Sequence, residues 1–217
     1  MTRLAVFDCD GTLVDGQGAV CAAMEAAFES VEATPPARPD IRRIVGLSLP
    51  QAVVRLSPGL PPAIQERIVA AYRHAFRSVR EAGMLEEPLF DGIAELLDGL
   101  RGAGWLLGVA TGKSDRGLEA CLAVHGLRGH FITLQTADRH PSKPDPAMLH
   151  AAMREADAMP ATTVMIGDTV FDIATARAAG VRPLGVAWGY HAPEELLEAG
   201  AAAVAATPGD LERMLNG

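Results

Sequence analysis

The chain has 217 residues, of which 49% are apolar and 21% are charged, the balance of an ordinary globular protein. Its formal net charge is −8 and its longest basic run is the pair Arg42-Arg43, so the sequence lacks the basic patch of a nucleic-acid-binding protein. No stretch approaches the roughly 20 consecutive apolar residues of a membrane span, and we expect neither nucleic acid nor a membrane as a partner.

The first predicted element is a short, apolar and buried strand over residues 4–7. Residues 16–84 show helical periodicity without a strand pattern. Within them, helices are predicted over residues 18–32 and 62–80, and a proline-rich loop over residues 34–39.

Beyond this region, predicted helices and strands alternate along the chain, which is typical of right-handed βαβ units and a parallel sheet. The predicted strands lie at residues 105–110, 131–134, 162–166 and 183–187. The predicted helices lie at residues 93–100, 118–125, 146–155 and 172–179. A small edge strand is expected within the alanine-rich residues 199–206.

The strand at residues 4–7 needs neighbours, and the nearest predicted strands lie beyond residue 100. We therefore predict an α/β fold, a doubly wound parallel Rossmann-like sheet interrupted after its first strand by an inserted α-helical cap domain. The core would comprise residues 1–15 and 85–217, and the cap residues 16–84. In such sheets, ligands bind at the carboxyl ends of the strands.

Polar residues follow the predicted strands at this edge or open a nearby helix. They are Asp8 and Asp10, Thr111 and Gly112, Lys143, and Asp168 with Asp172. Two carboxylates about 4 Å apart repel by about 4 kcal/mol at an effective dielectric constant near 20, so a cation is needed among them. Lys143 and Mg²⁺, which prefers oxygen ligands, fit this requirement.

Four segments together show that the chain resembles the haloacid dehalogenase superfamily, in its phosphoglycolate-phosphatase-like branch with a helical cap. The segments are Asp8-Cys9-Asp10-Gly11-Thr12-Leu13-Val14-Asp15, Ala110-Thr111-Gly112, Ser142-Lys143-Pro144-Asp145-Pro146 and Gly167-Asp168-Thr169-Val170-Phe171-Asp172. The resemblance implies a Mg²⁺-dependent phosphatase that hydrolyses a small phosphorylated metabolite, either phosphoglycolate-like or a sugar phosphate, through an aspartyl-phosphate intermediate.

The resemblance also implies roles for the acidic residues. Asp8 would be the nucleophile, and Asp10 would be the general acid and then the general base. Mg²⁺ would be held by the carboxylate of Asp8, the backbone carbonyl of Asp10 and the carboxylate of Asp168. Asp172 would support the metal or hold Lys143.

For the phosphoryl group, the resemblance implies three binding residues. The hydroxyl of Thr111 and the backbone amide of Gly112 would bind its oxygens, and Lys143 would neutralise their charge. Arg42, Arg43 and Lys113 are further candidates for contact with the substrate, with a solvent-exposed position as the alternative.

Three other functions compete with a phosphatase. A phosphomutase of the same superfamily, the main alternative, carries a cap histidine and an arginine where this chain has Val20 and Leu49. A haloacid dehalogenase needs no metal and normally lacks the second aspartate, here Asp10. In a signalling receiver domain the lysine follows all other motifs, whereas Lys143 precedes Asp168.

Two further features bear on substrate and compartment. Residues 16–19 lack the Ser and Asp that often follow the first motif in phosphoglycolate-type relatives, which argues against phosphoglycolate itself. Cys9, Cys21 and Cys121 are spaced for neither a zinc site nor a disulfide framework. With no signal peptide before the first strand, these features predict reduced thiols in a cytoplasmic protein.

Overall fold

A computed structural model describes residues 1–217, and it contains a six-stranded sheet in which every neighbouring pair is parallel. The strands are β1 (Leu4–Phe7), β2 (Leu106–Thr111), β3 (Phe131–Thr136), β4 (Thr163–Gly167), β5 (Arg182–Val186) and β6 (Ala203–Ala205). Their order is β3-β2-β1-β4-β5-β6. Successive strands are thus added on one side of β1 as far as β3, and on its other side from β4 onward. A ligand crevice is expected at this switch point, beyond the carboxyl end of β1.

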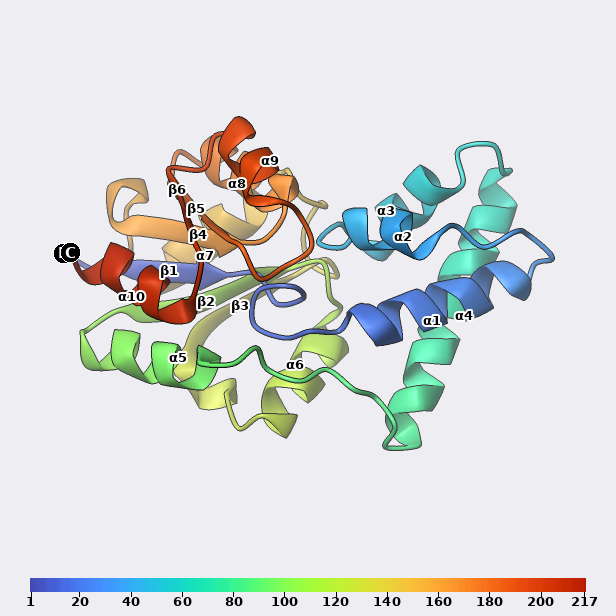
Figure 1. The fold of residues 1–217 in the computed structure, drawn as a ribbon, viewed down its shortest axis with the longest axis horizontal. Helices are drawn as coiled ribbons and strands as arrows, with labels where there is room; N and C mark the ends of the chain where they lie inside the picture. The colour runs from blue at the N-terminus through green and yellow to red at the C-terminus, as the bar shows by residue number, and fades with distance from the viewer.

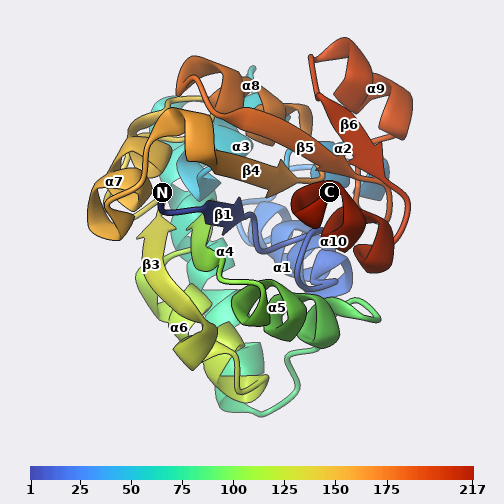
Figure 2. The same ribbon diagram turned by 90° about the vertical axis from the view of Figure 1, so that its left-hand side faces the viewer.

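Helices cover both faces of the sheet (Figure 2). One face packs against α5 (Ile93–Gly102), α6 (Asp115–Val124) and α10 (Pro208–Asn216). The other face packs against α7 (Ala147–Ala156) and α8 (Val170–Ala178), while α9 (Pro193–Glu198) lies against β5 and β6. Short 3-10 turns lie at Arg128–His130 and Pro160–Thr162.

The central strand β1 is buried on both faces, which explains its unbroken apolar sequence. Ala5 and Phe7 belong to the core under α5 and α6, whereas Leu4 and Val6 belong to the core under α7 and α8. Strand β1 thus forms a rigid base for the acidic segment that follows it.

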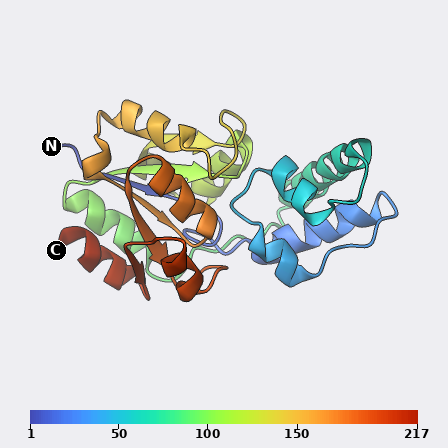
Figure 3. The same cartoon turned by 90° about the horizontal axis from the view of Figure 1, so that it is seen from above.

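The chain between β1 and α5 forms a separate layer of four helices. They are α1 (Gln17–Glu29), α2 (Arg38–Arg43), α3 (Leu49–Leu56) and α4 (Pro62–Glu81). They enclose a small apolar core of their own, which includes Met24, Phe28 and Ile68. Figures 1 and 3 show these helices beyond one end of the sheet, with both chain termini at the opposite end. We call this helical layer the cap.

The predicted fold class is confirmed, and the strands predicted with limits are each present within two residues of those limits, with β6 inside residues 199–206 as expected. The predicted loop over residues 34–39 was wrong at its end, because α2 begins at Arg38 with Pro39 in its first turn, where proline is tolerated. Helix α8 begins at Val170, two residues before its predicted start, because Thr169 caps it. None of the helices has the length and apolar character needed to cross a membrane.

Candidate active site

Asp8 lies directly beyond β1 and is fully buried. Its Oδ1 accepts a hydrogen bond from the backbone N–H of Cys9 at 2.6 Å and lies 3.0 Å from Nζ of Lys143. Its Oδ2 is buried without a hydrogen-bond partner. A buried carboxylate oxygen without a partner is costly, so Oδ2 is the atom in this site most suited to meet a cation or an incoming reactant.

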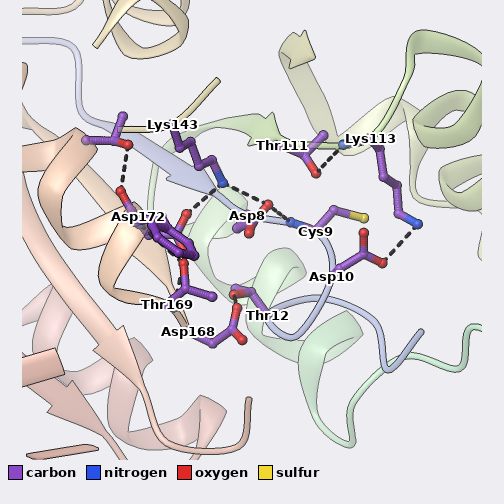
Figure 4. Close-up of polar contacts among 12 residues, drawn as sticks. Asp8, Cys9, Asp10, Thr12, Thr111, Lys113, Lys143, Asp168, Thr169 and Asp172 are labelled. Atoms are coloured by element: carbon purple, nitrogen blue, oxygen red, sulfur yellow. Dashed lines mark hydrogen bonds and ion pairs between the residues drawn. The ribbon is translucent and has the colours of Figure 1, made fainter. Parts of the chain in front are cut away.

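Lys143 is also buried, and it joins Asp8 to Asp172 (Figure 4). Its Nζ donates to Oδ1 of Asp172 at 2.6 Å. The other oxygen of Asp172 accepts from the backbone N–H of Thr169 at 3.1 Å and from its hydroxyl at 2.7 Å, in the capping box that starts α8. Burial lowers the pKa of Lys143, but Asp172 and Asp8 outweigh burial and raise it above its ordinary value, which keeps the ammonium charged.

Asp168 follows β4 and is held by two donors. Its Oδ1 accepts from the hydroxyl of Thr12 and its Oδ2 from the backbone N–H of Tyr190, both at 2.9 Å. Gly11 makes this position accessible, since it has a φ of +81° and an added Cβ would lie 2.1 Å from Oδ2 of Asp168. The Asp10-Gly11 turn therefore brings the first motif against the fourth.

Asp8, Asp168 and Asp172 form an oxygen cluster that fits a divalent metal ion. One ligand atom from each lies within 4.8 Å of the others, and all three residues are buried. Burial raises the pKa of Asp8 to about 7, although Lys143 opposes the rise, and burial raises the pKa of Asp168 well above its ordinary value. Because only Lys143 offsets these charges directly, and because the donors are all oxygens, a hard cation suits the cluster.

The side chain of Asp10 lies apart from this cluster and pairs with Lys113. Its Oδ1 is 2.9 Å from Nζ of Lys113, which is 2.5 Å from Oε1 of Glu87. All three side chains are nearly buried. The sequence leaves the role of Lys113 open and carries no signal for Glu87, because a single glutamate in the segment between the cap and α5 matches no motif.

The end of β2 meets the cap backbone. Thr111 is buried, and its hydroxyl accepts from the backbone N–H of Lys113 at 3.2 Å. An added Cβ on Gly112 would lie 2.4 Å from the carbonyl oxygen of Leu47, and one on Gly46 would lie 3.6 Å from Oδ2 of Asp8. Gly112 therefore allows the cap backbone to approach the end of β2 closely, and Gly46, whose φ is +97°, adopts a backbone conformation that favours glycine where the cap segment lies next to Asp8.

Further contacts hold the cap against the core. The backbone N–H of Ser48 donates to the hydroxyl of Ser142 at 2.8 Å. Arg43 forms an exposed ion pair with Glu195 at 2.6 Å, and its carbonyl lies 3.1 Å from Nε2 of His191. Arg43 is thus engaged at the cap–core junction, and neither it nor Arg42 lines the cavity next to Asp10.

The structure therefore brings the predicted residues to one edge of the sheet. Asp8, Lys143, Asp168 and Asp172 form a single network, with Asp10 beside it. Thr111 is the last residue of the adjacent strand β2 and Gly112 follows it, and their role in binding the phosphoryl group stays a prediction. A buried acidic cluster with a paired lysine at the switch point of a doubly wound sheet is typical of α/β enzymes that hydrolyse or transfer a group.

Comparison with known proteins gives the family. The haloacid dehalogenase-like hydrolase family matches residues 5–186, and the chain belongs to this family. Among curated relatives, a protein named probable phosphatase IndB from Dickeya dadantii is 36% identical over 200 residues, covering 90% of this chain and 86% of that protein. A phosphoglycolate phosphatase from Xylella fastidiosa is 28% identical over 194 residues, covering 89% and 83%.

Two other matches complete this picture. A protein named tyrosine-protein kinase PtkA from Mycobacterium tuberculosis is 32% identical over 189 residues, which are 87% of this chain and 63% of that longer protein. The crystal structure of a predicted phosphatase from Clostridium acetobutylicum superimposes with a TM-score of 0.89, at 24% identity and with 99% and 98% of the two chains covered. The last match concerns the fold, which it supports over the whole chain.

Proposed function

We propose that this protein is a Mg²⁺-dependent phosphatase that hydrolyses a small phosphorylated metabolite through an aspartyl-phosphate on Asp8. The observation that carries the proposal is the buried Oδ2 of Asp8, which has no partner and lies in a carboxylate cluster beside a charged lysine. The family and the relatives named as phosphatases support the same reaction.

In the first half of the reaction, a carboxylate oxygen of Asp8 attacks phosphorus and the bond to the ester oxygen breaks. Asp10 gives its proton to the departing alkoxide, which leaves as an alcohol. The side chain of Asp10 is suited to this step because it faces the cavity between cap and core, where the alcohol portion would lie. Lys113 and Glu87 hold this carboxylate in place.

In the second half, Asp10 takes a proton from water, and the resulting hydroxide attacks phosphorus. The bond to Asp8 breaks and inorganic phosphate leaves, so that one water is consumed per ester. The segment of the cap at Gly46 lies over Asp8 and would exclude other water while the phospho-enzyme forms.

Asp8, Asp168 and the backbone carbonyl of Asp10 would hold Mg²⁺, which would supply positive charge to the phosphoryl oxygens. Asp172 is better suited to hold Lys143 than to bind the metal, since both of its oxygens already accept hydrogen bonds. The Thr111 hydroxyl and the Gly112 amide would contact phosphoryl oxygens, as would Lys143.

We further propose cap limits of 16–84 and core limits of 1–15 and 85–217, because the four cap helices span residues 17–81. A cytoplasmic location is proposed because all three cysteines are buried and free, in accord with a reducing compartment.

The proposal is tested with a generic aryl phosphate, p-nitrophenyl phosphate, in the presence of Mg²⁺. Asp8→Asn should abolish turnover, while Asp40→Asn, the same change at an exposed cap position, should leave it intact. Turnover by the Asp8→Asn protein, or equal turnover with and without EDTA, would contradict the assigned chemistry. A screen of phosphorylated metabolites for released phosphate would then identify the substrate.

The phosphomutase alternative receives no support from the cap. Val20 and Leu49, which stand where the mutases carry histidine and arginine, both line the cavity and offer only apolar surface. The relative named as a kinase makes phosphoryl transfer from ATP to tyrosine a second outcome to measure. Phosphotyrosine formed from ATP without release of phosphate from esters would favour it over hydrolysis.

A further inference from the structure

The cavity between cap and core has a charge opposite to that of the whole chain. Its volume is about 400 Å³, and it extends from Asp10 to helix α4. Its lining contains two acidic side chains, Asp10 and Asp138, and a larger basic set: Arg73, Arg77, Arg80, Lys113 and Arg116. In a chain of net charge −8, such a lining favours an anionic occupant.

These basic residues are not equivalent, because some are already neutralised. Lys113 lies between two carboxylates, and Arg116 pairs with one at 3.3 Å. Arg73 and Arg77 form no ion pair but are exposed to solvent. Arg80 is half-buried and forms no ion pair, and its Nε is buried without a hydrogen-bond partner. Arg80 is therefore the partly desolvated cation of the cavity that remains free to bind an anion.

An aromatic surface connects Arg80 to the catalytic end of the cavity. The ring of Phe76 lies 5.5 Å from Cζ of Arg80 and 5.8 Å from Nζ of Lys113, the lysine that pairs with Asp10. Tyr72 stacks on Phe76 with ring centroids 5.6 Å apart. A leaving group that extends from Asp10 would thus pass an apolar ring before it reaches the free guanidinium.

We infer that Arg80 selects phosphate monoesters whose alcohol portion carries a second anionic group beyond an apolar or aromatic part, which packs on Phe76. If the alcohol portion is very short, its second anionic group would lie near Lys113, where two carboxylates already neutralise the ammonium. A longer alcohol portion would place this group at Arg80, whose planar guanidinium can bind it with two hydrogen bonds. The inference rests on the proposed function, because it assumes that Asp10 faces the leaving alcohol.

The test compares two substrates that differ by one carboxylate, phenyl phosphate and 4-carboxyphenyl phosphate. For the unmodified enzyme, kcat/KM should favour the carboxylated ester by about tenfold, the size of one charge-assisted hydrogen bond. Arg80→Gln should remove this preference through a higher KM for that ester, and should leave phenyl phosphate hydrolysis unchanged. Arg80→Lys should retain part of the preference.

The matched control is Arg67→Gln, the same change at an exposed position of α4 outside the cavity, which should behave like the unmodified enzyme. The inference is overturned if the unmodified enzyme shows no preference, or if Arg80→Gln keeps it. If Arg80→Gln and Arg80→Lys both lose hydrolysis of the two esters to the same extent, Arg80 has a structural role, and the inference is also overturned. Failure of the unmodified enzyme to hydrolyse either ester would instead contradict the proposed function.

Discussion

Removing the charge of Asp8 should change how the stability of the metal-free protein depends on pH. Burial raises the pKa of Asp8 from 3.8 to about 7, so the folded protein holds a proton that the unfolded chain releases. The stability from this group is therefore fully present below pH 3.8 and is lost as the pH rises through about 7. Between about pH 5 and pH 8, linkage gives a loss of about 2–3 kcal/mol.

The Asp8→Asn protein carries no such carboxyl group, so it should lose about 2–3 kcal/mol less than the unmodified protein over the same interval. Urea denaturation in EDTA, performed at both pH values, measures the free energy of unfolding of each protein. Asp40→Asn, an exposed change of the same kind, should follow the unmodified protein. Adding Mg²⁺ at the higher pH should stabilise the unmodified protein more than Asp8→Asn, because the metal offsets the buried charge.

Equal losses of stability for the unmodified protein and Asp8→Asn between the two pH values would refute this reasoning. Such a result would mean that Asp8 is ionised in the folded, metal-free protein at no energetic cost. The pairing with Lys143 at 3.0 Å would then outweigh burial, and the unpaired Oδ2 would no longer argue for a cation.

Two further changes test the support around the site. Glu87→Gln should lower kcat for p-nitrophenyl phosphate by about tenfold with little change in KM, because Lys113 would lose one of its two carboxylate partners and would hold Asp10 less firmly for proton transfer. An unchanged kcat would show that Glu87 has no positioning role. Glu195→Ala breaks the exposed ion pair with Arg43 and should raise KM by less than about threefold, since exposed ion pairs contribute little. A much larger increase of KM, measured by steady-state kinetics, would show that this pair keeps the cap closed.

The sheet could be predicted from the sequence because each strand is short, apolar and followed by turn residues. The short helices α2 and α3 were not predicted individually, since each offers fewer than nine residues of periodicity and begins with a proline in its first turn. Helix α9, with six residues, and helix α10, with nine, were also missed. Each has a proline in its first turn, and the two helices flank the alanine-rich residues 199–206. In these cases tertiary packing, rather than local pattern, sets the structure.

The candidate site could be predicted to the extent that strand ends and motifs define it. The sequence placed Asp8, Lys143 and Asp168 at one edge because parallel strands share their carboxyl ends. It could not show that Asp172 is held by Thr169, nor that Glu87 reaches Lys113 across the cap–core connection. Such contacts depend on how separate segments pack, and a single sequence carries no direct signal for them.

Helix α4 shows where the sequence held more information than its apolar pattern. Its apolar residues at three- and four-residue steps predicted a helix packed against the cap core. Arg73, Phe76, Arg77 and Arg80 follow the same spacing, i, i+3, i+4 and i+7, and therefore share a second face of the helix. In the structure all four line the cavity beside Asp10. Phe76 also packs against the cap core, whereas the three arginines lie only along the cavity side of the helix. Substitutions of Arg73, Arg77 and Arg80 should therefore alter substrate preference without unfolding the cap.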